Sequence, residues 1–351
     1  MLILGIETSC DETAAAVVED GVKVLSNVVV SQIDIFAEYG GVIPEVAARN
    51  HLEVMMPVVD KALKDAGKTW GEIDAIAVTH TPGLLGSLLI GTLTARTLAI
   101  LHKKPLYAVH HLKSHIYANW LIEESSIASE KSTLDFPLLA LVVSGGHTQI
   151  LRMEAHNHFE IIGTTRDDAV GECFDKVAKI LGLPYPGGPA ITKAAKDGDR
   201  NKYKLPKPNV EGLDFSFSGL KTAVLRAVQA ELGLPISHPS HDLKNHLNKT
   251  QIADFAASFE KTAVDYLLNK LEKAYESNPE TKSFVFAGGV SANELLRKEA
   301  EKRFNNVFFP EPKYSGDNGA MVAAAVYFEI KTGVQPIDPY KLNIMPRSKI
   351  S

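Results

Sequence analysis

Cysteine is scarce in this sequence, and so is any sign of export. The 351 residues include two cysteines, Cys10 and Cys173, too few for a disulfide framework. A chain of this kind is typical of a reducing compartment, and we expect it in the cytoplasm. Its first residues also lack the basic start, the long apolar stretch and the small-residue cleavage site of a signal peptide.

Long apolar runs and an excess of positive charge are missing as well. The longest apolar tracts, such as 137–143, fall far short of the roughly 20 residues of a membrane-spanning helix, so we expect no membrane association. Lysine and arginine total 37 against 42 aspartates and glutamates, a net charge of −5. Bulk charge therefore excludes general nucleic-acid binding and leaves local basic patches as the route to a polyanion.

The composition that is present suits a folded α/β protein. Hydrophobic residues make up 45% and charged residues 23%, as in average soluble globular proteins, and the length corresponds to about two domains. Short apolar runs alternate with amphipathic segments, which favours α/β domains. We expect strands at 2–7, 14–18, 73–79, 138–143, 148–151 and 283–287, and helices at 49–66, 88–101, 171–181, 294–304 and from about 320.

Two of these strand pairs look alike. Residues 2–7 and 14–18 enclose the polar turn 8–13, and the strands at 138–143 and 148–151 enclose Ser144-Gly145-Gly146-His147. Two such hairpins, about 136 residues apart, predict a duplicated domain. The alternative is two unrelated hairpins in one α/β protein.

A pair of histidines suggests a metal site. His111 and His115 are four residues apart, which on a helix places both imidazoles on one face. Exposed helical histidines are common, so a third ligand is needed to support the assignment. A zinc-peptidase motif requires Glu immediately after the first histidine, and Leu112 stands there. Imidazoles with a carboxylate suit iron or zinc, and the residue types do not choose between them.

Glycine turns and a polar hairpin tip suggest a phosphate-bearing ligand. The turns at 144–147 and 288–289 allow close backbone approach with free N–H groups, although either one alone is a weak signal. At the first hairpin tip, Asp11 and Glu12 could accept a proton or hold a cation, or could be a solvated turn. The Walker and dinucleotide fingerprints are absent from the sequence, which disfavours P-loop enzymes and dehydrogenases.

One loop is locally basic. The stretch 193–207 has six cationic residues against two aspartates and includes Tyr203. This composition suits contact with phosphates and a stacked base, and equally suits a solvated loop.

Taken together, several motifs resemble one family. These are Gly5-Ile6-Glu7-Thr8-Ser9-Cys10-Asp11-Glu12-Thr13, the His111/His115 pair, Val143-Ser144-Gly145-Gly146-His147, Asp214-Phe215-Ser216-Phe217-Ser218-Gly219-Leu220-Lys221, Ala287-Gly288-Gly289-Val290-Ser291-Ala292-Asn293 and Gly316-Asp317-Asn318-Gly319. Their order and spacing are similar to those of the tRNA N6-adenosine threonylcarbamoyltransferase family, catalytic subunit of the bacterial type, once labelled an O-sialoglycoprotein endopeptidase. The family belongs to the actin, Hsp70 and sugar-kinase superfold.

The resemblance implies a fold and an activity. The fold would be two duplicated actin/Hsp70-like domains with a nucleotide cleft between them, the first from 1–131 plus 318–345 and the second from 132–317. The activity would be transfer of a threonylcarbamoyl group from threonylcarbamoyl-adenylate to N6 of the adenosine 3′ of the anticodon, in tRNAs reading codons that begin with A.

The resemblance also implies site residues and partners. One transition metal ion per subunit, iron or zinc, would be held by His111, His115 and Asp317. The adenylate would be bound by the following residues: Val143, Ser144, Gly145, Gly146, His147, Asp175, Gly188, Thr192 and Asn293. The partners would be tRNA, a degenerate paralogous subunit of the same fold and a small P-loop ATPase, with ATP and magnesium belonging to that complex.

The match departs from the family pattern at one position. Thr192 stands where relatives often have aspartate, and a hydroxyl gives a weaker hydrogen bond than a carboxylate, so the grip on the ribose is expected to differ. For the chemistry, Asp11 and Glu12 are our candidates to accept the amine proton or to orient the base. We expect Asp11 to be solvent-accessible at its turn.

Two other functions remain as alternatives. A small-molecule kinase of the same superfold would transfer phosphate from ATP, but it leaves the histidine pair without a role. A nucleotide-switched binding module is the second alternative, and its Hsp70 relatives carry an additional substrate-binding domain.

Overall fold

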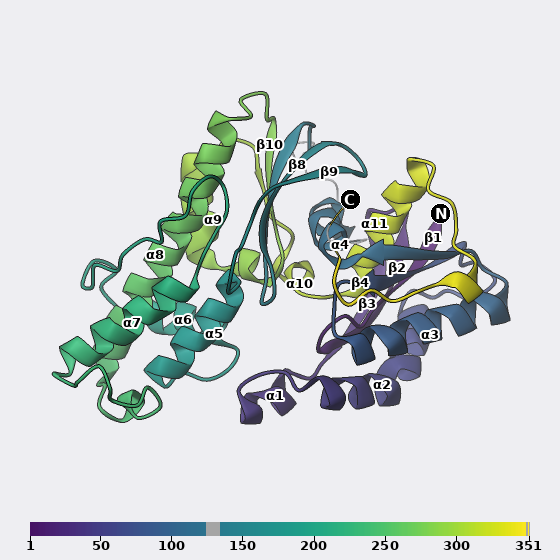
Figure 1. Cartoon of the computed structure of the whole chain (residues 1–351). Coiled ribbons are helices and arrows are strands. Elements are labelled where there is room, and N and C mark those ends of the chain that lie inside the picture. The colour runs from purple at the N-terminus through teal and green to yellow at the C-terminus, as the bar shows by residue number, and fades with distance from the viewer. Residues whose placement is uncertain (124–133, 349, 351) are drawn as a thin grey trace.

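Two β-sheets form the framework of the molecule in the computed structural model, which describes residues 1–123, 134–348 and 350 (Figure 1). The first sheet has the order β5-β4-β1-β2-β3-β6. Its strands are β1 (Leu2–Glu7), β2 (Glu12–Glu19), β3 (Lys23–Ser31), β4 (Ala75–Thr81), β5 (Leu106–His110) and β6 (Ile122–Glu123). The second sheet has the order β11-β10-β7-β8-β9. Its strands are β7 (Leu138–Val143), β8 (Thr148–Ala155), β9 (His158–Thr164), β10 (Ser283–Ala287) and β11 (Val307–Phe308).

The two sheets repeat one topology. In the first, β1 pairs antiparallel with β2 and parallel with β4, and in the second, β7 pairs antiparallel with β8 and parallel with β10. The predicted α/β fold with duplicated hairpins is therefore confirmed. The residue boundaries predicted for the two domains stay a proposal.

Helices arrange these sheets into layers. α2 (Pro44–Asp65) and α3 (Leu85–His102) cover the outer face of the first sheet. α4 (His111–Tyr117) and α11 (Gly319–Lys331) lie between the sheets, since one core cluster joins both of them to residues of each sheet. The outer face of the second sheet is covered by α5 (Val170–Leu181), α6 (Gly187–Ala195), α7 (Ser218–Glu231), α8 (Lys249–Glu276) and α9 (Glu294–Arg303). In Figure 1 the yellow α11 accordingly returns to the purple strands of the first sheet.

Short helices complete the described chain. They are α1 (Ile33–Tyr39), α10 (Pro312–Ser315) and the 3-10 turns η1 (Ala118–Trp120), η2 (Leu243–Asn245), η3 (Gly289–Ala292) and η4 (Pro339–Lys341).

Helices α2 and α3 carry more exposed apolar surface than the sequence suggested. Leu52 and Met56 belong to the apolar set that places 49–66 on a helix, yet they are exposed, whereas Met55 and Val59 are buried. Among the described helices, α3 is long and apolar enough to cross a membrane by length and composition alone. It packs against α2 and β4.

A close approach of two glycines fixes the position of α11. A Cβ atom on Gly5 would lie 2.2 Å from the carbonyl oxygen of Gly319, and one on Gly319 would lie 2.6 Å from the amide nitrogen of Ala16. Only glycine allows helix and strand backbones to approach so closely. The contact brings Asp317 next to the first hairpin.

Candidate metal and adenylate site

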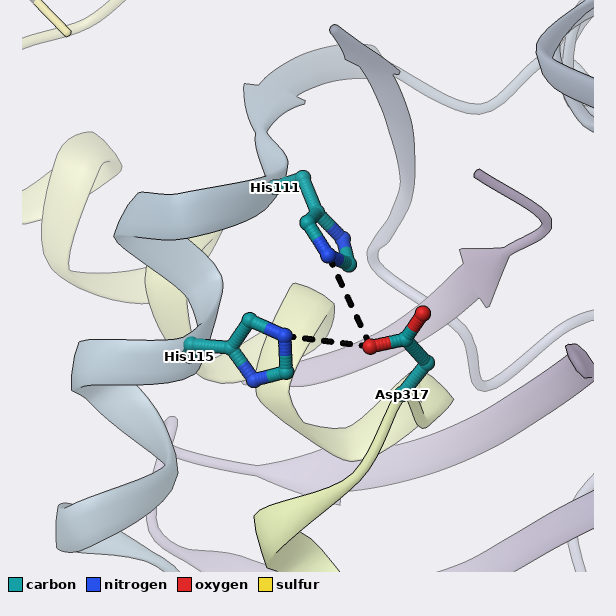
Figure 2. A group of neighbouring side chains, drawn as sticks. All are labelled: His111, His115 and Asp317. Atoms are coloured by element: carbon teal, nitrogen blue, oxygen red, sulfur yellow. Dashed lines mark ion pairs between the residues drawn. The ribbon is translucent and has the colours of Figure 1, made fainter. Parts of the chain in front are cut away.

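Three side chains converge where α4 meets the start of α11 (Figure 2). The Nε2 atoms of His111 and His115 lie 3.5 and 3.0 Å from Oδ1 of Asp317. The two imidazole rings are edge to face with centroids 4.6 Å apart. One ligand atom from each residue lies within 4.8 Å of the others. The structure thus brings together the three predicted ligands.

Local structure places each of these groups. α4 starts directly after β5, and its one-turn spacing sets both histidines on the same face. Asp317 precedes the N-cap of α11, which is Asn318, whose side chain accepts from the amide of Met321. Both histidines are buried, with 6% and 1% of their surface exposed, so the site lies deep between the layers.

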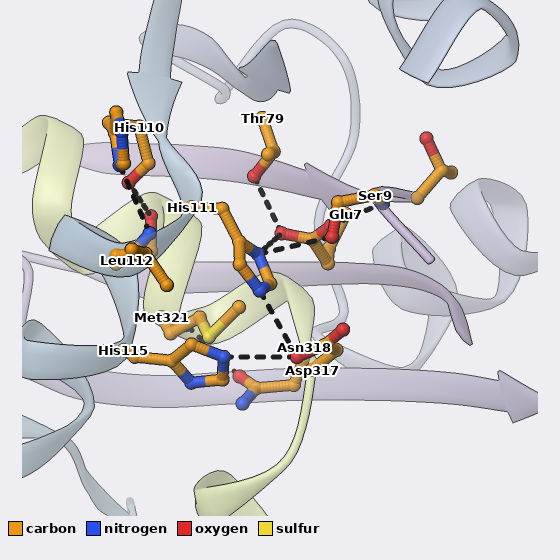
Figure 3. A network of polar contacts seen from close by, with 12 residues as sticks. Glu7, Ser9, Thr79, His110, His111, Leu112, His115, Asp317, Asn318 and Met321 are labelled. Carbon is orange, nitrogen blue, oxygen red and sulfur yellow. Dashed lines mark hydrogen bonds and ion pairs between the residues drawn. The ribbon is translucent and has the colours of Figure 1, made fainter. Parts of the chain in front are cut away.

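Glu7, which the sequence did not predict as a site residue, lies next to this cluster (Figure 3). The carboxylate is fully buried. Its Oε2 lies 3.1 Å from Nδ1 of His111 and accepts from the hydroxyl of Thr79, and its Oε1 accepts from the amide of Ser9. A carboxylate that accepts from Nδ1 leaves Nε2 of the same ring free for a metal. A charged residue that ends an apolar strand, as Glu7 does, was the signal for this role.

The electrostatics of the cluster favour a positive charge. Burial disfavours a charged imidazole, yet the carboxylates of Asp317 and Glu7 raise the pKa of His111 to about 9. Burial would raise the pKa of Asp317, but the charge of His111 and the contact with His115 hold it well below its usual value. Nδ1 of His115 is buried and has no hydrogen-bond partner among the described residues. Two imidazoles and a carboxylate in such a setting fit a transition metal ion.

A cavity of about 720 Å³ opens beside the cluster. It is lined by both hairpin tips, with Asp11 and Glu12 from the first and Gly145 to His147 from the second, and by His111 and Asp317. Gly145 and Gly146 have no atom within 4 Å of where a Cβ would stand. Their backbone therefore faces open space, as an anion-binding turn requires.

The acidic hairpin tip differs from the expected solvated turn. Asp11 is only 8% exposed, so the expectation of a solvent-accessible carboxylate is wrong. The tip folds against α2, because His51 bonds both to the hydroxyl of Thr13 and to the carbonyl of Cys10. Burial raises the pKa of Glu12 well above its usual value, and the charges of Asp317 and Asp11 add to the rise.

A second cavity, of about 620 Å³, continues into the second domain. It shares Gly145 and Asp175 with the first cavity and adds Gly188, Thr192 and Asn293. Each cavity has the size of a typical small-molecule site. Of the nine predicted adenylate residues, eight line one or both cavities: Ser144, Gly145, Gly146, His147, Asp175, Gly188, Thr192 and Asn293. Val143 is instead fully buried in β7.

Hydrogen bonds or burial determine the state of three of these side chains. Oδ1 of Asp175 accepts from the amide of Gly187 at 2.6 Å, which partly offsets the rise in pKa that burial causes. Burial lowers the pKa of His147 to about 4, so its imidazole is neutral at physiological pH. The side chain of Asn293 caps α9 with its oxygen, accepting from the amide of Leu296.

Glu260 on α8 is a second carboxylate that the sequence did not predict at the site. It is 1% exposed, and its Oε1 accepts from the hydroxyl of Thr192 and from the amide of Asn293, both at 2.8 Å. A carboxylate therefore stands directly behind the position where Thr192 departs from the family pattern. Nothing in the amphipathic sequence of this helix pointed to that contact.

In the basic loop two lysines are exposed and one face of the aromatic ring is covered. Lys202 and Lys204 are exposed. Tyr203 stacks on Phe255 with ring centroids 3.7 Å apart and an interplanar angle of 1°. One face of its ring is thus covered by Phe255, and stacking of a base on the other face stays a prediction.

Solved structures with the same fold support the architecture. The activator of the 2-hydroxyisocaproyl-CoA dehydratase from Clostridium difficile matches with a TM-score of 0.50 and 14% identity, over 96% of this chain and 100% of that one. Full-length HypF matches with a TM-score of 0.55 and 13% identity, over 94% of this chain and 46% of that one. The fold is that of the actin, Hsp70 and sugar-kinase superfold.

Curated relatives are much closer in sequence. A protein of Caldicellulosiruptor bescii is 47% identical over 99% of this chain and 97% of its own length. A protein of Symbiobacterium thermophilum is 49% identical over 95% of this chain and 93% of its own length. Both are named tRNA N6-adenosine threonylcarbamoyltransferase, and the profile of the family with that description matches residues 23–324. The chain belongs to the tRNA N6-adenosine threonylcarbamoyltransferase family.

Proposed function

We propose that this chain transfers a threonylcarbamoyl group from threonylcarbamoyl-adenylate to N6 of the adenosine 3′ of the anticodon, in tRNAs reading codons that begin with A. The observation that carries the proposal is the meeting of two features in one cleft. The histidine and aspartate cluster lines the same cavity as the open Gly145-Gly146 turn. A kinase of the same superfold needs the turn but has no use for the cluster.

The metal ion would be held by His111, His115 and Asp317, with iron and zinc both suited to this donor set. When bound, it supplies Lewis-acid stabilisation of negative charge on the acyl or phosphate oxygens. Glu7 keeps the His111 ring oriented for it.

The adenylate would lie across the two cavities. Backbone N–H groups of the 144–147 turn are suited to the phosphate. Asp175 is suited to the ribose hydroxyls, and Gly188, Thr192 and Asn293 form the wall beside it. The neutral imidazole of His147 adds a hydrogen-bonding group without charge.

The two acidic residues of the hairpin tip would divide the proton transfer. The adenine amine is a poor nucleophile and must lose a proton as the acyl bond forms. Glu12, with its strongly raised pKa, is suited to keep a proton. We therefore assign proton acceptance to Asp11, which faces the same cavity.

The test is single-turnover transfer from preformed threonylcarbamoyl-adenylate to unmodified tRNA, with modified nucleoside read by mass spectrometry. Asp11→Asn is expected to bind the adenylate and the metal normally and to transfer at about one hundredth of the normal rate or less, since a positioned proton acceptor contributes about 10²–10⁴. Asp60→Asn, an exposed carboxylate on α2, is the control.

Two results would contradict the proposal. Normal transfer by Asp11→Asn would remove this residue from the mechanism. Failure of the unaltered chain, in the presence of its partners, to modify tRNA while it phosphorylates a small molecule would favour the kinase alternative.

Partners of the catalytic chain are part of the proposal. Five exposed apolar residues on neighbouring helices suit a paralogous subunit of the same fold: Leu52, Met56, Leu85, Leu89 and Leu93. The exposed Lys202 and Lys204 suit the phosphates of tRNA. A small P-loop ATPase, which carries ATP and magnesium, completes the expected complex, and we place its work in the cytoplasm.

A further inference from the structure

A second group of metal-ligating side chains lies far from the first in the sequence. The connection from α7 to α8 carries His238, Asp242 and His246, each four residues from the next. The Nε2 atoms of both histidines lie 3.0 Å from Oδ2 of Asp242. One ligand atom from each residue lies within 4.8 Å of the others.

These distances suit a shared ion. Zinc binds imidazole nitrogen and carboxylate oxygen at about 2.0–2.2 Å, and two ligands of one tetrahedral ion therefore lie roughly 3.3 Å apart. The observed nitrogen–oxygen distances of 3.0 Å are close to that value. In the metal-free protein both contacts are hydrogen bonds, which a bound ion would replace.

The backbone of this connection is already held in shape. Gln229 on α7 is 2% exposed, and its Nε2 donates to the carbonyl oxygens of Ile236 and His238. Leu243 is fully buried in the core of the second domain, and Asn245 donates to Oδ1 of Asp242. Binding an ion would therefore cost little ordering of the chain.

The cluster is also accessible. The side chains of His238, Asp242 and His246 are 20%, 36% and 46% exposed. An ion can enter from solvent, and water can complete its coordination. A donor set of two imidazoles and one carboxylate suits zinc and similar divalent transition ions better than calcium or magnesium, which prefer oxygen ligands.

We propose that His238, Asp242 and His246 form a second binding site for a divalent transition metal ion of the zinc type. The site does not depend on the proposed transfer activity. Its place gives it a structural role, because Lys244 on the same connection lines a cavity of about 300 Å³ together with Asp175 and Tyr185. The ion would hold this connection in place beside the proposed adenylate cleft.

The experiment is a zinc titration of tag-free, metal-stripped protein, with bound zinc measured by elemental analysis after gel filtration. His238→Ala/His246→Ala is expected to bind one equivalent less than the unaltered chain. His111→Ala/His115→Ala is expected to keep the zinc ion bound by His238, Asp242 and His246, so the result is independent of the first cluster. His241→Ala, an exposed histidine of the same connection, is the matched control and should keep full stoichiometry.

A second measurement guards against a folding defect. Cobalt(II) replaces zinc and gives visible d–d absorption, which Asp242→Asn should weaken while its metal-free thermal unfolding remains normal. Equal zinc stoichiometry in the unaltered chain and in His238→Ala/His246→Ala would overturn the proposal. An equal loss in His241→Ala would overturn it too, since it would show dispersed surface binding.

Discussion

Two buried carboxylates contact residues that line the site, although they do not line it themselves. Glu7 contacts His111, and Glu260 contacts Thr192 and Asn293. Neither carboxylate lines the two cavities described above. Their effect is therefore on the position of other groups, and this can be measured separately from chemistry.

Replacing Glu7 by glutamine should weaken metal binding while leaving the fold intact. The amide matches the carboxylate in size but lacks its charge, so it holds the His111 ring less firmly. Loss of such an outer contact typically costs 10–100-fold in metal affinity. Competition with a chelator of known affinity measures the change.

The control for this variant is Glu329→Gln, a buried carboxylate on α11 that faces Lys113. It should keep normal metal affinity. If Glu7→Gln also binds metal normally, Glu7 supports only the strand that it ends.

Replacing Glu260 by methionine should raise KM for the adenylate with little change in kcat. Methionine removes the acceptor of two part-buried hydrogen bonds, from Thr192 and Asn293, and a hydrogen bond to a charged group contributes about 1.5–3 kcal/mol. The wall formed by Thr192 and Asn293 would loosen, and we expect KM to rise about tenfold, equivalent to about 1.4 kcal/mol.

Glu260→Gln distinguishes the two ways in which this residue could act. Glutamine retains one acceptor oxygen, so it should restore the KM if hydrogen bonding alone matters. A KM that stays raised in Glu260→Gln would show that the negative charge itself is needed. A fall in kcat with unchanged KM, in either variant, would contradict a positioning role.

The sequence pointed more directly to two of the proposed metal ligands than to the residues that support them. His111 and His115 are recognisable because their spacing is local to one helix turn. The contact between Thr192 and Glu260 joins residues 68 positions apart. Such a contact depends on how α6 packs on α8, which no local pattern contains. For the same reason the burial of Asp11 was missed, because the hairpin tip that carries it contacts α2, where His51 bonds to the carbonyl of Cys10.

At the scale of elements, the close packing of α11 on the first hairpin connects the fold to the site. Gly319 begins α11, two residues after Asp317. The atoms nearest to its missing Cβ all belong to backbone, namely Ala16 N, Ala15 C and Gly5 O at 2.6–2.8 Å. Backbone cannot move aside as a flexible side chain can.

Gly319→Ala should therefore destabilise the protein and weaken metal binding together. Overpacking of this kind typically costs about 1–3 kcal/mol, and moving α11 away displaces Asp317. Urea unfolding and chelator competition measure the two effects. Gly219→Ala, in the first turn of α7 with no atom near its missing Cβ, is the control and should be neutral or stabilising. Unchanged stability of Gly319→Ala would mean that the helix can shift without cost.

The strands and helices that the sequence predicted lie within a few residues of observed ones, for physical reasons that are local. Other elements were not predicted, among them β3, β5, β9, α6, α7 and the long helix α8. β7 and β10 match their predicted ranges because short apolar runs bounded by polar turns define buried strands. α2 begins at Pro44, five residues before the predicted start, and proline is favoured in the first turn of a helix. The exposure of Leu52 and Met56 was not predictable, since an apolar stripe does not show which part of it a neighbour covers.

At the scale of the whole molecule, duplication of the hairpin correctly predicted two sheets of like topology. The sequence did not show that α4 and α11 lie between them. That arrangement requires contacts between segments far apart in the chain, such as β1, α11 and β7, within one core cluster. The packing of the central layer therefore contributes to the stability of the whole protein.

The stability of this central layer depends on pH through Glu329 on α11. It is 6% exposed, and burial raises its pKa from 4.5 to about 7, although Lys113, whose Nζ lies 3.9 Å away, opposes the rise. Because the pKa of this carboxyl group is higher in the folded than in the unfolded protein, protonation of the group favours folding. The associated stability is therefore fully present below about pH 4.5 and is lost as the pH rises through about 7.

The loss should amount to at most roughly 3–4 kcal/mol, since the pKa rises from 4.5 to about 7 and each pKa unit corresponds to about 1.4 kcal/mol. Urea unfolding of the metal-free protein between pH 4.5 and 8 measures it as a difference between the unaltered chain and Glu329→Gln, which stays neutral throughout. Other groups titrate in both proteins and cancel in that difference. Glu276→Gln, an exposed position on α8, should show the same pH dependence as the unaltered chain. If Glu329→Gln shows it as well, Glu329 ionises without cost, and the central layer must be more hydrated than its burial indicates.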